Sequence, residues 1–114
     1  MFSPLIAAGM LCILLGLVHS FMGEALIFRR GEVTSNHFRG IIWATWHLAT
    51  LLAFGLAAIL ILTPREILPL MGLPLRIIAA CLAMSGVIVF GATQGRHPGW
   101  VVLCVISGLI FAGL

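Results

Sequence analysis

The chain has 114 residues, of which 62% are hydrophobic and 8% are charged, and its mean hydropathy is +1.26. Soluble domains carry about 25% charged residues, so this composition excludes an ordinary soluble domain and indicates an integral membrane protein. The net charge is only +3, and the six arginines lie in or beside polar connections rather than in one basic stripe. That distribution argues against a nucleic-acid partner.

Four apolar segments are long enough, or nearly long enough, to cross a bilayer. They cover about residues 5–28, 41–62, 74–93 and 98–114. A span needs about 20 residues, and the last segment, with about 17, can cross if the bilayer thins locally. Because the connections are short, successive helices should be antiparallel neighbours. The sequence therefore predicts an all-α, single-domain membrane protein with four transmembrane helices in an up-down-up-down bundle.

The arginines predict the orientation of this bundle in the lipid bilayer. The first and third connections, on one side, contain Arg29, Arg30, Arg39 and Arg96. The opposite side contains Arg65 and Arg76. Cytoplasmic loops carry an excess of Lys and Arg, so we expect the first and third connections in the cytoplasm and both termini outside it.

A seam of small residues runs along the first segment. Gly9, Gly16 and Gly23 repeat every seven residues, and Cys12 and His19 fall between them with the same spacing. Small residues let membrane helices approach closely. We therefore expect His19 to face another helix rather than lipid.

A polar and aromatic patch is predicted at the start of the second segment. Trp43, His47 and Thr50 share a helix face at positions i, i+4 and i+7, and Trp46 borders that face. His47 follows Arg39 by eight residues, which places it about 12 Å into the membrane.

Three histidines are predicted to lie at one end of the bundle, as judged by their depth in the membrane. His19 precedes Arg29 by ten residues, or about 15 Å, so it should lie at nearly the level of His47 on the neighbouring helix. His97 follows the third segment and should lie at the mouth of the same polar pocket. The opposite half of the bundle has few polar residues.

Glu24 completes this pocket, since a carboxylate inside a membrane needs a partner. One interpretation is a salt bridge to Arg29, Arg30 or Arg96. Another is metal ligation together with His19. Glu24 lies about 140° around a regular helix from His19, so a shared metal would need a kink at Gly23 or a ligand from a neighbouring helix.

The histidines likewise allow two interpretations. They can form hydrogen bonds between helices, which are worth about 0.6–2 kcal/mol. They can instead ligate a transition-metal ion or a haem iron, because neutral imidazole is a common ligand. The candidate metal ligands are His19, His47, His97 and Glu24. In the haem interpretation His19 and His47 would be axial ligands. The residues expected around the cofactor are Trp43 and Trp46 as walls, with Arg29, Arg39 and Arg96 attracting an anionic group such as a propionate.

Three stretches carry a resemblance at the level of family. "HSFMGE", "WATWH" and "GRHPGW" together resemble small uncharacterised bacterial four-helix membrane proteins. The resemblance implies a bacterial inner-membrane location and no known activity. The length and four spans are also similar to small multidrug-resistance transporters, which use a membrane glutamate in their first helix. Here, Glu24 lies at the far end of that segment, and its surroundings depart from that family's pattern.

The sequence thus supports two main hypotheses for function. In the first, the protein binds a metal ion or haem in a His/Glu pocket near the cytoplasmic side. In the second, it is a non-catalytic accessory or assembly subunit of a larger membrane complex, or a homo-oligomer, and the polar residues form a helix–helix network. A small multidrug-type transporter is a third alternative. No residue is assigned a catalytic role.

Overall fold

The structure, a computed structural model, describes residues 3–29 and 36–114, and every regular element in that part of the chain is helical. In chain order the elements are α1 (Pro4–Met22), the π-helix η1 (Gly23–Phe28), α2 (Asn36–Leu62), the 3₁₀-helix η2 (Arg65–Ile67), α3 (Leu68–Thr93) and α4 (Gly99–Ala112). The all-α prediction is confirmed, with four α-helices among the described residues.

Three helical stretches are long and apolar enough to cross a membrane. They are Pro4–Phe28, Phe38–Leu62 and Arg65–Thr93, with 25, 25 and 29 residues and mean hydropathies of 2.2, 2.0 and 2.1. α4 is equally apolar but has only 14 residues, which corresponds to about 21 Å of helix. The fourth crossing therefore stays a prediction.

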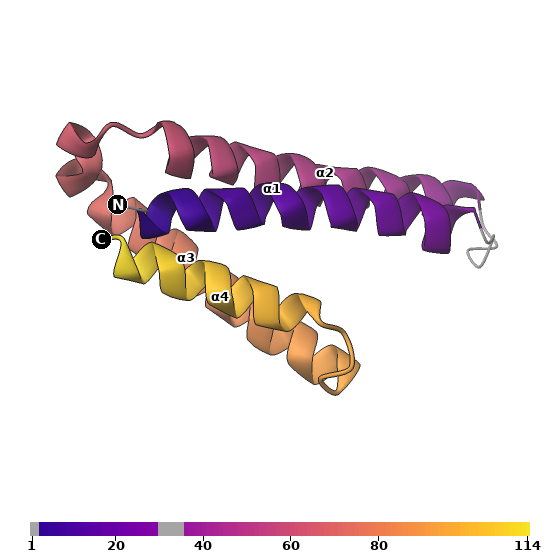
Figure 1. Cartoon of the computed structure of the whole chain (residues 1–114). Helices are drawn as coiled ribbons and strands as arrows, with labels where there is room; N and C mark the ends of the chain where they lie inside the picture. Colours follow the sequence, from indigo (N-terminus) through magenta and orange to yellow (C-terminus); the bar gives the residue numbers. More distant parts are fainter. Residues whose placement is uncertain (1–2, 30–35) are drawn as a thin grey trace.

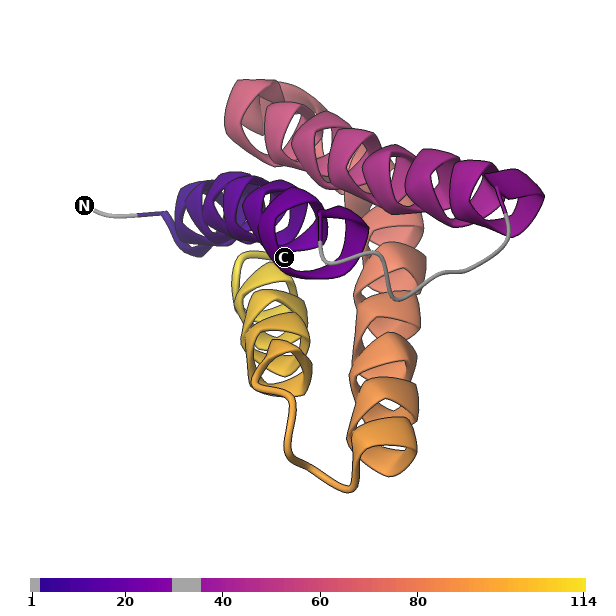
Figure 2. The ribbon, with the colours of Figure 1, turned by 90° about the vertical axis from the view of Figure 1, so that its right-hand side faces the viewer.

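The helices form two antiparallel hairpins that meet at one end and diverge at the other (Figure 1). α1 packs on α2, α3 packs on α4, and α4 also contacts α1, whereas the described parts of α2 and α3 do not pack closely on each other. Figure 2 shows the second hairpin running across the first. Chain direction alternates as expected, but the hairpins form a V rather than a closed bundle. The short α4 cannot hold α1 along its full length.

The apolar core lies at the closed end of the V, close to both chain ends (Figure 1). Each of the four helices contributes to it. Its buried members are Leu5, Ala8, Cys12, Ala57, Leu60, Leu75, Ala79, Ile106 and Ile110. Packing at this end joins the two hairpins.

The predicted glycine seam holds α1 against α2. A Cβ added at Gly9 would lie 2.6 Å from Ile61, and one at Gly16 would lie 2.6 Å from Phe54. At Gly23 it would overlap the indole of Trp46. The heptad spacing of the glycines is therefore matched by three large side chains of α2, and the prediction that this seam faces another helix is confirmed.

The second hairpin is joined by its own small-residue contacts. The Ser107 hydroxyl donates a hydrogen bond to the carbonyl of Ala79 at 2.7 Å. A Cβ at Gly86 would lie 2.8 Å from the sulfur of Cys104. These contacts let α4 lie close along α3.

α3 begins earlier than the predicted third span. It starts at Leu68, and Pro74 lies inside it. Proline removes one backbone donor, which is why the sequence favoured a boundary there. Membrane helices tolerate such prolines because neighbouring groups satisfy the freed carbonyl.

Candidate functional site

Glu24 is the acceptor at the centre of a polar contact between the first two helices. Its Oε1 accepts hydrogen bonds from Trp43 Nε1 at 2.7 Å and from His47 Nε2 at 2.9 Å. An ionised carboxylate only accepts, so this arrangement requires the proton of His47 to be on Nε2. The side chains of His47 and Glu24 are 25% and 45% exposed, so the pair is partly open to its surroundings.

Glu24 lies at the start of a local change of helix type. The π-helix η1 begins at Gly23, and the Arg29 amide donates to the Glu24 carbonyl across five residues at 3.2 Å. The Arg39 guanidinium donates to the carbonyl of Phe28 and so fixes the end of the π-helix to α2. Single π-turns of this kind often occur at functional sites.

His19 is held by α2 on two sides. Its ring stacks on Trp46, with centroids 4.1 Å apart and planes 7° from parallel, and Trp46 Nε1 donates to the His19 carbonyl at 2.8 Å. His19 Nδ1 lies 3.2 Å from Thr50 Oγ1. The Thr50 hydroxyl also lies 3.4 Å from the carbonyl of Trp46, so it can donate either to that carbonyl or to His19. Contact with Thr50 engages Nδ1 of His19.

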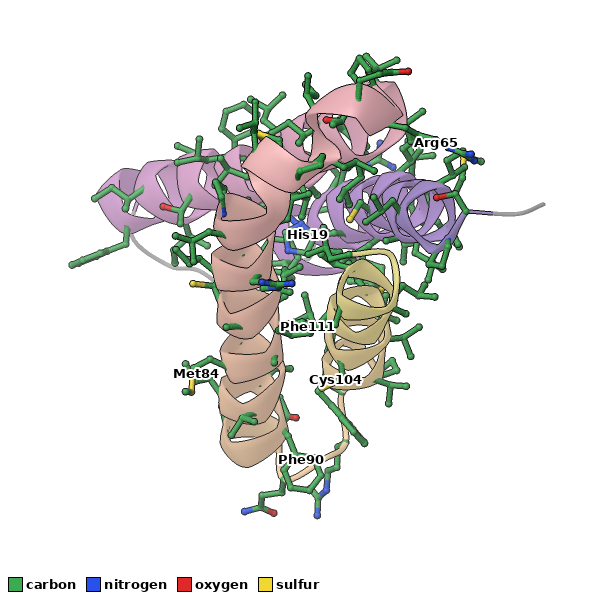
Figure 3. The ribbon with its side chains drawn as sticks, turned by 90° about the vertical axis from the view of Figure 1, so that its left-hand side faces the viewer. His19, Arg65, Met84, Phe90, Cys104 and Phe111 are labelled. Atoms are coloured by element: carbon green, nitrogen blue, oxygen red, sulfur yellow. The ribbon has the colours of Figure 1, made fainter. Side chains whose placement is uncertain are left out.

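A cavity of about 490 Å³ lies between the two hairpins and receives residues from all four helices. Its polar lining residues are His19, Thr50, Ser85 and His97. Figure 3 shows His19 near the crossing of the hairpins. Leu52, which also lines the cavity, is 66% exposed, so the space reaches the outer surface of the protein at the level of the spans.

His97 lies in the turn before α4 and lines this cavity. Its Nδ1 accepts a hydrogen bond from the Gly99 amide at 3.0 Å. A nitrogen that accepts carries no proton, so the proton of the neutral ring is on Nε2. Nε2–H of the neutral His97 ring is therefore a hydrogen-bond donor.

The predicted metal ligands separate into two groups. Glu24 and His47 bond to each other, whereas His19 and His97 line the cavity. Among the described residues no three His, Cys, Asp or Glu side chains lie close enough to hold a metal ion. The structure therefore offers no support for a single ion held by all four candidates.

The other predicted site residues also lie in different places: some line the cavity and others do not. Trp46 lines the cavity, whereas Trp43 contacts the His47 ring at a centroid distance of 4.4 Å and donates to Glu24. Within the described part of the chain, the side chains that donate to Glu24 are Trp43 and His47, and no arginine does so. Of the arginines proposed for that role, Arg29 and Arg96 are exposed and Arg30 lies outside the described residues.

Two hydrogen-bonding partners of the cavity histidines were not identified from the sequence. Thr50 was placed on the correct helix face but not recognised as the partner of His19. The Gly99 amide, which sets the proton position of His97, is a backbone group and gives no sequence signal.

Comparison with family models, with curated proteins and with solved structures finds no match for this chain. The geometry of the site is therefore the basis for assigning a function.

Proposed function

We propose that this chain is an integral membrane protein that binds one flat, lipophilic cofactor or ligand between its two hairpins, with His19 as the principal polar contact. The observation that carries the proposal is the orientation of the His19 ring. Stacking on Trp46 and the contact between Nδ1 and Thr50 orient this ring, which lines the cavity. Orientation of an imidazole through its second nitrogen is what ligand-binding histidines require.

The cavity has the dimensions and lining of a ligand site. Its volume of about 490 Å³ falls in the range of about 300–1,000 Å³ that is usual for small-molecule pockets. Most lining residues are apolar, and a few polar groups gather toward the open end. Haem is one occupant that this lining suits, since His19 Nε2 can serve as an axial ligand and Arg96 adjoins His97 at the mouth.

The proposed placement in the membrane follows from charge. The four-span, up-down-up-down topology would put the open end of the V, with Arg29, Arg39 and Arg96, at the cytoplasmic face of a bacterial inner membrane. Both termini would then lie outside the cytoplasm. Three helices of sufficient length and hydropathy support this placement.

The polar contact between the first two helices supports a second candidate function. Trp43, His47 and Glu24 bond to one another and do not line the cavity. Such a closed network suits a non-catalytic accessory or assembly subunit, in which the polar residues serve only to join two helices.

Extraction of bound small molecules from the purified protein distinguishes ligand binding from the accessory-subunit function. We expect the full chain, purified in mild detergent, to carry a lipophilic small molecule at close to one per chain, measured by mass spectrometry of an organic extract. His19→Ala should lower this occupancy at least about tenfold, because it removes the oriented imidazole ring. His47→Gln is the matched control, since position 47 lies outside the cavity and glutamine keeps a donor for Glu24.

A wild-type protein that yields no such molecule, and that also takes up no added haem as judged by its absorption spectrum, would contradict the binding function. Equal occupancy in the His19→Ala and wild-type proteins would contradict the role of His19. Folding of each variant is checked by circular dichroism, so that a loss of ligand is not confused with a loss of structure.

A further inference from the structure

Arg76 is a charged side chain at the border of the outward, apolar face of α3. It is exposed, and it does not line the cavity between the hairpins. The large apolar side chains on this face are 55% to 80% exposed, and they are Leu70, Leu73, Ile77 and Met84. Such a face suits lipid, where a charged side chain is costly and is found close to the headgroups. Arg76 therefore needs an explanation that the helix packing does not supply.

The described residues offer Arg76 no partner. Its guanidinium makes no hydrogen bond or ion pair with any of them. Glu66, the acidic residue closest to it in the sequence, is not paired with it. A guanidinium carries five N–H donors, so the groups that satisfy Arg76 must come from the surroundings of the helix.

The packing of α4 on α3 fixes the level of Arg76. The Ser107 hydroxyl donates to the carbonyl of Ala79, and the two helices are antiparallel. Arg76, which precedes Ala79 by three residues, is therefore level with the last turn of α4, which ends at Ala112. From Arg76 to Thr93, α3 rises by about 26 Å, which is close to the hydrocarbon thickness of about 30 Å. This length puts Arg76 at the boundary between hydrocarbon and headgroups.

The helical residues before Arg76 extend past that boundary. The stretch Arg65–Thr93 has 29 residues, or about 43 Å, which exceeds the hydrocarbon thickness by more than about 10 Å. Its first turns can therefore lie among the headgroups. Arg65, labelled in Figure 3, is exposed in this part and adds a second positive charge, against the single negative charge of Glu66.

We propose that Arg76 binds the phosphate of an anionic phospholipid, at the end of the protein where the two hairpins join. A guanidinium matches a phosphate through two parallel N–H···O bonds and is weakly hydrated, so it suits a site at the lipid boundary. Leu73 and Ile77 provide an exposed apolar surface for the acyl chains. Two arginines against one glutamate favour a headgroup with a net negative charge. The site is separate from the cavity, so this inference goes beyond the proposed function.

The test is a titration of the full chain in an uncharged detergent, followed by native mass spectrometry, which counts bound lipids. The probe is phosphatidylglycerol, and the comparison probes are diacylglycerol with the same chains and inorganic phosphate. We expect Arg76→Gln to weaken phosphatidylglycerol binding about tenfold, which is the effect of losing one charge-assisted hydrogen bond. Arg76→Lys should weaken it only about threefold, because lysine keeps the charge but not the paired donors.

Arg65→Gln is the matched control, since it removes the same charge at the same end. About 16 Å of helix separates position 65 from position 76, which is more than the Debye length at physiological salt. We therefore expect Arg65→Gln to weaken binding by no more than about twofold. Equal losses in Arg65→Gln and Arg76→Gln would overturn the site and indicate attraction by net charge alone. Circular dichroism checks that each variant is folded.

The other probes identify the source of the phosphate. Diacylglycerol binding as tight as that of phosphatidylglycerol would overturn a role for the phosphate, and equally tight binding of inorganic phosphate would overturn the lipid. Unchanged binding in Arg76→Gln would overturn the role of Arg76. His19→Ala should leave phosphatidylglycerol binding unchanged. A loss in His19→Ala without one in Arg76→Gln would place the lipid in the cavity, which would overturn this inference and leave the proposed function intact.

Discussion

Gly23→Ala should destabilise the first hairpin, whereas Gly55→Ala should leave it equally stable or make it more stable. A Cβ at position 23 would overlap the indole of Trp46, and the ring is fixed there by its bond to the His19 carbonyl. Overpacking of this kind costs about 1–3 kcal/mol. Gly55 has nothing within 4 Å of an added Cβ, so there alanine gains up to about 1 kcal/mol of helix propensity.

The measurement is the free energy of unfolding of both variants in detergent micelles. Opposite signs are expected for the two changes, although each adds the same methyl group. A second variant tests the cause: Trp46→Phe, which replaces the indole by a smaller ring, should recover part of the stability lost in Gly23→Ala. If Gly23→Ala and Gly55→Ala change the free energy of unfolding in the same direction and by the same amount, the close contact between α1 and α2 at this level is not present.

The glycine contact also shows which parts of the fold could be predicted. Gly9, Gly16 and Gly23 were recognised because small residues at a fixed period describe a helix face without knowledge of the partner. The structure adds that Ile61, Phe54 and Trp46 fill the spaces they leave. The angle between the hairpins could not be predicted in this way, because it depends on the length of α4 and on contacts between residues far apart in the chain.

Depth counted from the arginines predicted that His19, His47 and His97 lie at one end of the protein, but it could not decide which of them meets Glu24. In the structure Glu24 bonds to His47, whereas His19 and His97 line the cavity. The side chains that meet across two helices depend on how the helices pack, which hydrophobic periodicity does not describe.

The partners of the two cavity histidines could not be predicted from the sequence either. His19 contacts Thr50, and His97 accepts a hydrogen bond from the Gly99 amide. Neither partner follows from spacing, since one contact crosses between helices and the other involves the backbone.

Glu24→Ala should lower the thermal stability of the protein far more than Glu24→Gln. Alanine leaves Trp43 Nε1 and His47 Nε2 without their shared acceptor, and donors left unpaired in a membrane are costly. Glutamine retains a carbonyl oxygen in the same place, so both bonds can persist without the charge. The midpoint of thermal unfolding in detergent, followed by circular dichroism, measures the difference.

A double-mutant cycle then tests whether Glu24 and His47 act as a unit. Because both variants remove the same bond, Glu24→Ala combined with His47→Ala should lower the midpoint little more than the larger single change. Arg29→Ala is the control for the alternative partner, and we expect it to leave the midpoint nearly unchanged. Additive losses at positions 24 and 47, or a loss in Arg29→Ala as large as that in His47→Ala, would mean that the carboxylate is held by an arginine.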